Sequence, residues 1–155
     1  MTTQRDTYTA ANQQAWNASA DFHRAGADWD RLVEGFGERG FSCLDAVETA
    51  ALEELDVAGR DVVQICCNNA RELLSVRNMG AARCVGFDQA GSFLEQGREL
   101  AAVAGQEIEL VETDIYRIGA EYDGAFDLAL ITIGVFGWMP DLAAFISLPA
   151  RLLKP

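Results

Sequence analysis

Positive charge, histidine and long apolar runs are scarce in this sequence, and each shortage excludes a class of function. Twelve Lys and Arg residues face twenty-four Asp and Glu residues, so the formal net charge is −12. This charge repels the phosphates of nucleic acids and of anionic lipids, so we expect no nucleic-acid partner and no membrane partner. No apolar run approaches the roughly 18 residues of a membrane span, and residues 1–10 lack the apolar core of a secretion signal. The sequence thus predicts a cytoplasmic protein.

Metal ligands and nucleophile systems are equally sparse. His23 is the only histidine, and the cysteines have no CxxC spacing; they are Cys43, Cys66, Cys67 and Cys84. A zinc site needs several such ligands at close spacing, so we expect no metal and interpret the cysteines as reduced packing residues. His23 lies in a polar stretch far from any GxSxG-like turn, which argues against a Ser-His-Asp or Cys-His nucleophile.

Length and composition indicate one globular unit. A chain of 155 residues that are 50% hydrophobic can bury a sizeable core, and a mean hydropathy of +0.02 excludes a disordered protein. The pattern changes near Gly59. We therefore predict an N-terminal helical cover over residues 1–58 and a core over residues 59–155.

The N-terminal part predicts three helices. Thr9 can cap the first, which runs to Phe22, and shorter helices are expected around residues 29–36 and 44–55. One face of the first helix is mixed polar and aromatic, and it suits a lid over a ligand better than a buried helix. The residues of that face are Asn12, Trp16, Ser19 and His23.

After Gly59, short β-branched runs alternate with helical lengths, which is typical of an α/β protein with a parallel sheet. The predicted strands are Asp61–Cys66, Arg83–Asp88, Ile108–Glu112 and Phe126–Ile133, and the predicted helices between them are Ala70–Met79 and Gly91–Ala104. The fourth strand is apolar enough to be buried on both faces. A last helix opens at Pro140 and Asp141, and Pro149 should break or kink it.

In such sheets ligands bind at the carboxyl ends of the strands, beside the first strand. The first strand ends in the turn 66–69 (CCNN), where asparagine can adopt the positive φ that glycine usually provides. Asp88 ends the second strand, twenty residues after Asn68, at the spacing of a carboxylate that binds ribose hydroxyls. A nicotinamide dinucleotide or S-adenosylmethionine (SAM) could use it. The turn has no glycine for a pyrophosphate, which favours SAM.

Five segments of this chain resemble the class I SAM-dependent methyltransferases. They are residues 57–69 (VAGRDVVQICCNN), 80–88, 111–116 (VETDIY), 126–142 and 151–155 (RLLKP), in the order and spacing of that family. Residues 12–23 also resemble the N-terminal helix that covers the cofactor pocket in a small-molecule branch. The resemblance implies a Rossmann-like three-layer sandwich with SAM as its cofactor.

The resemblance also implies roles for individual residues. Asp88 would accept the ribose hydroxyls, Asp114 and Ile115 would meet the adenine, and the backbone near Cys66, Asn68 and Ile131 would hold the methionine part. The full expected cofactor set is Gln64, Cys66, Asn68, Asn69, Asp88, Gln89, Asp114, Ile115, Ile131 and Thr132. The expected lid or substrate residues are Trp16, His23, Phe136 and Trp138. Two departures stand out: Cys66, Asn68 and Ala70 replace the family's glycines, and Gln89 replaces an apolar residue.

The functional hypothesis is methyl transfer from SAM to a small-molecule acceptor. This reaction needs positioning more than a dedicated catalytic residue, so none is assigned, although His23, Tyr8 and Tyr116 are candidate bases. Alternatives are a catalytically silent SAM-binding or ligand-binding module and a dinucleotide-dependent oxidoreductase.

The resemblance finally implies that further C-terminal strands are missing after Pro155. The family places Leu152–Pro155 just before a Gly-Gly turn and three more strands. The fourth strand would then present an open edge, which the last helix or a second copy should cover, so a homodimer of this chain is expected.

Overall fold

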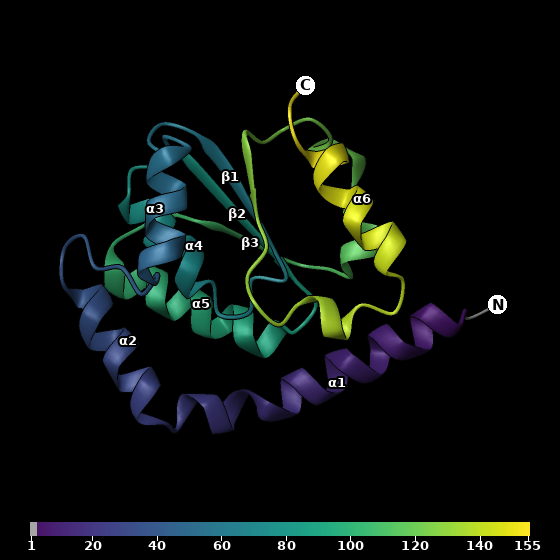
Figure 1. Ribbon diagram of the computed structural model, residues 1–155. Helices are drawn as coiled ribbons and strands as arrows, with labels where there is room; N and C mark the ends of the chain where they lie inside the picture. The colour runs from purple at the N-terminus through teal and green to yellow at the C-terminus, as the bar shows by residue number, and fades with distance from the viewer. Residues whose placement is uncertain (1–2) are drawn as a thin grey trace.

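The computed structural model describes residues 3–155 and contains one four-stranded sheet (Figure 1). The strands are β1 (Asp61–Ile65), β2 (Arg83–Asp88), β3 (Glu109–Glu112) and β4 (Leu128–Leu130). All pairs are parallel, and the order across the sheet is β3-β2-β1-β4. The order therefore reverses beside β1, between β1 and β4. This arrangement leaves a crevice at the carboxyl ends of these two strands.

Six α-helices surround the sheet. They are α1 (Gln4–Arg24), α2 (Ala27–Gly37), α3 (Ala46–Glu54), α4 (Arg71–Asn78), α5 (Gly91–Ala104) and α6 (Leu142–Leu152). The 3-10 turns η1 (Ile115–Arg117) and η2 (Ala120–Tyr122) lie between β3 and β4, and η3 (Phe136–Trp138) lies between β4 and α6. No described helix is both long and apolar enough to cross a bilayer.

Alternate residues of β1 supply the two faces of the sheet. Val63 and Ile65 pack against α6 through Phe145 and Leu148, whereas Val62 packs against α4 and α5 on the opposite face. A further apolar cluster of α2 residues covers α4 and α5 from outside. The expected three-layer α/β sandwich with a parallel sheet is thus confirmed.

The predicted fourth strand, Phe126–Ile133, is wrong in its extent. Only Leu128–Leu130 pair with β1, and these residues are half-buried rather than buried on both faces. β4 is an edge strand in the described chain, so it lacks a neighbour on its outer side. Phe126 instead bridges to Leu153, just after α6. The residue after α6 therefore pairs with the first residue of the predicted strand, outside β4.

The predicted start of the first helix is also wrong. Thr3 is the N-cap, because its hydroxyl accepts the Asp6 N–H at 3.1 Å while the Asp6 carboxylate accepts the Thr3 N–H at 2.8 Å. Thr9 lies inside the helix, and its hydroxyl donates to the Arg5 carbonyl at 2.8 Å. The helix thereby gains a turn and a half and lies across one end of the sheet (Figure 1).

Pro149 does not break the last helix. α6 begins after Asp141, whose carboxylate caps it at the Ala144 N–H, and continues through Pro149 to Leu152. Proline removes only one N–H donor, and buried Phe145, Leu148 and Leu152 anchor both sides of it against the sheet. Packing outweighs the local preference here.

Candidate functional site

A cavity of about 650 Å³ lies at the carboxyl ends of β1 and β2. Its walls come from α1 and α2, the start of α3, the turn after β1 with the start of α4, the residues after β2 with Phe93 of α5, η1, and the segment that follows β4. Ten of the fourteen residues singled out as site residues from the sequence line it: Cys66, Asn68, Asn69, Asp88, Gln89, Ile115, Thr132, Trp16, His23 and Trp138. Its volume falls within the roughly 300–1,000 Å³ typical of small-molecule sites.

The turn after β1 has the backbone of a glycine-rich loop without its glycines. Cys66, Asn68 and Ala70 have φ angles of 59°, 52° and 55°, all in the left-handed region. Left-handed backbone costs a non-glycine residue about 1–2 kcal/mol, although asparagine tolerates it better. The positive φ expected for asparagine is confirmed, and two further residues share it. β1 ends at Ile65 because Cys66 leaves extended geometry.

Asp88 connects this turn to the start of α5. One carboxylate oxygen accepts the Asn68 N–H at 2.8 Å, and the other accepts the Ala90 N–H at 2.9 Å. Burial raises the pKa of Asp88, while these backbone donors oppose the rise. The carboxylate is therefore oriented toward the cavity edge by two bonds, and each oxygen retains a lone pair for a ligand.

Of the residues expected around the adenine, Ile115 and Gln89 line the cavity and Asp114 does not. Ile115 is buried and lines the cavity, and Gln89 lines it beside Gln13, whose side chain donates to the Gln89 carbonyl at 2.8 Å. Asp114 does not line the cavity. Its carboxylate caps η1 by accepting the Tyr116 N–H at 3.0 Å and lies near Arg117.

Three other expected residues also lie outside the cavity lining. Gln64 is fully buried in β1, and Ile131 packs partly against the core on the α6 side of the sheet. Phe136 is 58% exposed and contacts Phe145 edge-on, with ring centroids 5.8 Å apart. The sequence could not separate these from lining residues, because it shows which residues follow a strand and not which way they point.

The lid face of α1 contacts the rest of the cavity wall. The Trp16 ring lies 5.1 Å from Trp138 and 5.8 Å from Phe93, both edge-on. The Asn12 side chain donates to the Trp138 carbonyl at 2.9 Å. His23 lies at the same wall, 5.4 Å from Phe93. α1 is therefore attached to both the segment after β4 and the start of α5.

Sequence reasoning missed several lining residues, among them Arg71, Glu72 and Phe93, whereas it expected Asn12 on the lid face and Tyr116 as a candidate base. The pair Arg71 and Glu72 carried a signal, since both directly follow the turn after the first strand. Tyr116 is less available than expected for a base. Its hydroxyl donates to the Asp141 carbonyl at 3.0 Å, and burial raises its pKa.

The cavity lining is acidic. Asp28, Asp45, Glu48, Glu72 and Asp88 line it, against only Arg31 and Arg71 among strong bases. Both arginines lie beside carboxylates: Arg31 is 3.5 Å from Asp28, and Arg71 is 2.8 Å from Glu72. The field in the cavity thus favours a ligand with net positive charge.

The cysteines at the turn are protected from reaction. All four cysteines have free thiols. Burial, with a smaller contribution from Asp88, raises the pKa values of Cys66 and Cys67. Both thiols are neutral at ordinary pH and are poor nucleophiles, so the turn uses them for packing.

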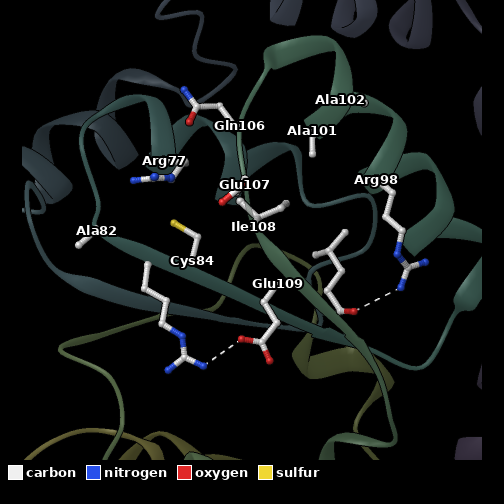
Figure 2. Close-up of a pocket in the computed structure, with 12 residues that line it drawn as sticks. Arg77, Ala82, Cys84, Arg98, Ala101, Ala102, Gln106, Glu107, Ile108 and Glu109 are labelled. Atoms are coloured by element: carbon white, nitrogen blue, oxygen red, sulfur yellow. Dashed lines mark hydrogen bonds and ion pairs between the residues drawn. The ribbon is translucent and has the colours of Figure 1, made fainter.

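A second hollow lies between the end of α4, α5 and β3 (Figure 2). Its arginines already have protein partners. Arg83 pairs with Glu109 at 2.9 Å, Arg98 donates to the Leu110 carbonyl at 3.3 Å, and Arg77 donates to the Ala81 carbonyl. This shallow hollow provides no cluster of unused polar groups comparable with the cavity at the strand ends.

Comparisons with known proteins agree with this geometry. The family described as "Methyltransferase domain" matches residues 62–155, which is more than half of the chain. A search of curated proteins finds no matching sequence.

Solved structures share the fold at low identity. A SAM-dependent methyltransferase from Mesorhizobium loti has a TM-score of 0.58 at 23% identity, with 71% of this chain and 49% of that chain covered. A putative SAM-dependent methyltransferase from Methanococcus maripaludis scores 0.65 at 14% identity, covering 99% and 63%. The phosphoethanolamine N-methyltransferase 1 of Haemonchus contortus scores 0.69 at 16% identity, covering 98% and 31%.

This chain thus spans about half the length of the first of these structures and less than two thirds of the others. The family match begins inside β1 and includes the turn and Asp88, which are the elements that build the cavity. With the sheet order and the site at its reversal point, this match shows that the chain belongs to the methyltransferase-domain family.

Proposed function

We propose that this chain binds SAM in the cavity at the strand ends and transfers its methyl group to a small-molecule acceptor. The observation that carries the proposal is the carboxylate of Asp88, which lines the cavity at the end of β2 and is oriented by the turn after β1. A carboxylate at this place and spacing is the usual acceptor for ribose hydroxyls.

The residues of the cavity suit this cofactor. Asp88 would take the ribose, Gln89 and Ile115 would flank the adenine, and the turn 66–70 would lie against the methionine end. SAM has no phosphate, so it does not require the glycines that the turn lacks. Its sulfonium also gives it positive charge, which the acidic lining favours. When bound, SAM would supply an electrophilic methyl group.

The chain's own contribution to the reaction is positioning and exclusion of water. Trp16 of α1 and Trp138 contact each other in the cavity lining, and the acceptor would lie against them with its nucleophilic atom in line with the methyl group. No base is assigned. His23 is the candidate that lines the cavity, whereas Tyr8 lies outside the lining and the Tyr116 hydroxyl is engaged with Asp141.

A small acceptor is supported by the cover over the cavity. α1 forms one wall of the cavity and is attached by side-chain hydrogen bonds from Asn12 and Gln13. A protein or nucleic-acid acceptor would have to displace this helix, and the net charge of −12 further disfavours a nucleic acid.

A silent SAM-binding module is the second candidate, and one observation favours it. Cys66, Asn68 and Ala70 have side chains at the left-handed positions of the turn, where glycine would let a ligand approach the backbone closely. A dinucleotide is disfavoured for the same reason, because a pyrophosphate needs that approach more.

Calorimetric titration separates these possibilities. SAM and S-adenosylhomocysteine should bind, and NAD should not. Methyl transfer from labelled SAM to a panel of amines, hydroxyl compounds and thiols then distinguishes the enzyme from the silent module. Binding of NAD alone would contradict the proposal, and SAM binding without turnover on any acceptor would favour the module.

A further inference from the structure

Gln64, the next-to-last residue of β1, has a polar side chain that the fold does not explain. Gln64 is fully buried on the sheet face that Val62 shares, beneath α4. Its neighbours in register are Gly86 and Leu130, which offer it no side-chain hydrogen bond. Its Oε1 has no hydrogen-bond partner among residues 3–155. A buried amide with an unused acceptor is destabilising, and an apolar residue would be more stable here.

The only side-chain hydrogen bond of Gln64 within the described chain points to Glu72. The Gln64 Nε2 lies 3.5 Å from Glu72 Oε2, a long and weak contact. Glu72 belongs to the first turn of α4, and its side chain is only 16% exposed. Its other oxygen, Oε1, accepts the Arg71 Nε–H at 2.8 Å. Arg71 thus bonds one carboxylate oxygen firmly, and the other has the Gln64 amide beside it and can still accept a hydrogen bond from a ligand.

Glu72 also lines the cavity. Asp88 bonds to the middle of the turn 66–70, and Glu72 is attached to the strand that precedes it. The same cavity therefore has two carboxylates near the turn. Glu72 lies in the first turn of α4, where the helix dipole favours a negative charge. The dipole does not account for the buried amide of Gln64 beside that charge.

SAM offers a different group to each of these two carboxylates. Its ribose hydroxyls suit Asp88, and its methionine end carries an ammonium and a carboxylate. We propose that Glu72, held in place by Gln64, accepts the ammonium group of the methionine end. This inference rests on the proposed function. It adds a cofactor-binding residue on α4 and assigns to Gln64 a positioning role instead of direct contact with the cofactor.

The test compares two ligands on the full chain. S-adenosylhomocysteine has the ammonium, whereas 5′-methylthioadenosine keeps the adenine, ribose and thioether without it. By calorimetry, Glu72→Gln should weaken S-adenosylhomocysteine by about tenfold or more and leave 5′-methylthioadenosine unchanged. Gln64→Met should give a smaller loss with the same selectivity, which a merely structural role would not produce. Glu95→Gln makes the same charge change on the exposed face of α5 and should alter neither affinity.

The outcomes separate this inference from the proposed function. Equal losses for the two ligands in Glu72→Gln, or no loss for either, would overturn the role of Glu72. Failure of the unaltered chain to bind both ligands would contradict SAM binding itself, and this inference with it. Circular dichroism melting checks the fold of each variant. If Glu72→Gln does not fold, the shorter carboxylate of Glu72→Asp provides the same comparison, with a selective loss expected.

Discussion

At the scale of single residues, Asp88 has the largest predicted effect on binding. Asp88→Asn keeps a similar shape but removes the charge that would accept the ribose hydroxyls. We expect S-adenosylhomocysteine to bind about tenfold to a hundredfold more weakly, as for hydrogen bonds to a charged group. Calorimetry measures this, with Asp123→Asn, an exposed carboxylate paired with Arg151, as the control. Unchanged affinity in Asp88→Asn would place the ribose elsewhere.

The same carboxyl predicts a pH dependence. Burial raises the pKa of Asp88 above the usual 3.8, so it takes up a proton at a higher pH than an ordinary aspartate. Protonation removes the charged acceptor, and the affinity for S-adenosylhomocysteine should therefore fall as the pH is lowered toward that raised pKa. The dissociation constant measured from pH 7.5 down to pH 5 reports the effect. A parallel fall in Asp88→Asn would assign the pH dependence to another group.

At the scale of elements, α1 should act as a lid. Asn12 and Gln13 attach it to the carbonyls of Trp138 and Gln89. Removing both side chains by Asn12→Ala with Gln13→Ala should increase the dissociation rate of S-adenosylhomocysteine severalfold, because an opened lid lets the ligand leave. Stopped-flow tryptophan fluorescence follows this, and Trp16→Phe should diminish the signal.

Gln14 provides the matched control for the lid. It is exposed on the same helix, so Gln14→Ala alters α1 without touching its attachment to the cavity. The lid hypothesis predicts no change in the dissociation rate for this variant. A rate unaltered in the double variant as well would show that α1 does not control access to the cavity.

At the scale of the whole molecule, we predict self-association. Apolar side chains are exposed along the segment after β4 and on α6: Ile133, Phe136, Leu142 and Ile146. The outer edge of β4 also has no partner strand in the described chain. An open edge beside apolar side chains favours pairing with a second copy. The net charge of −12 opposes this pairing, so added salt should strengthen it by screening.

Sedimentation velocity over a range of protein and salt concentrations tests this prediction. We expect a dimer that grows with both concentrations and that weakens in Ile146→Glu, since Ile146 is 60% exposed and lies outside the cavity lining. A monomer at every concentration, with no binding of a hydrophobic dye, would contradict it.

The sequence by itself determined most of the core. It predicted β2 and α5 to the residue, and it singled out the turn after β1 and Asp88, which line the cavity. These features depend on short-range patterns: alternating apolar runs, a C-terminal glycine at Gly105, and residues that directly follow strands. Such patterns lie within one element, so an isolated sequence contains them.

Tertiary structure decided the rest, because those features depend on contacts between distant residues. β4 is shorter and more exposed than its apolar run suggests, since it pairs on one side only. Asn12 meets Trp138 across 126 positions of sequence, and no local pattern encodes that contact. The sequence did not show the direction of side chains either: Asp114 caps η1 outside the cavity lining, whereas Glu72 lines the cavity. Packing selects these orientations, and packing exists only once the chain has folded.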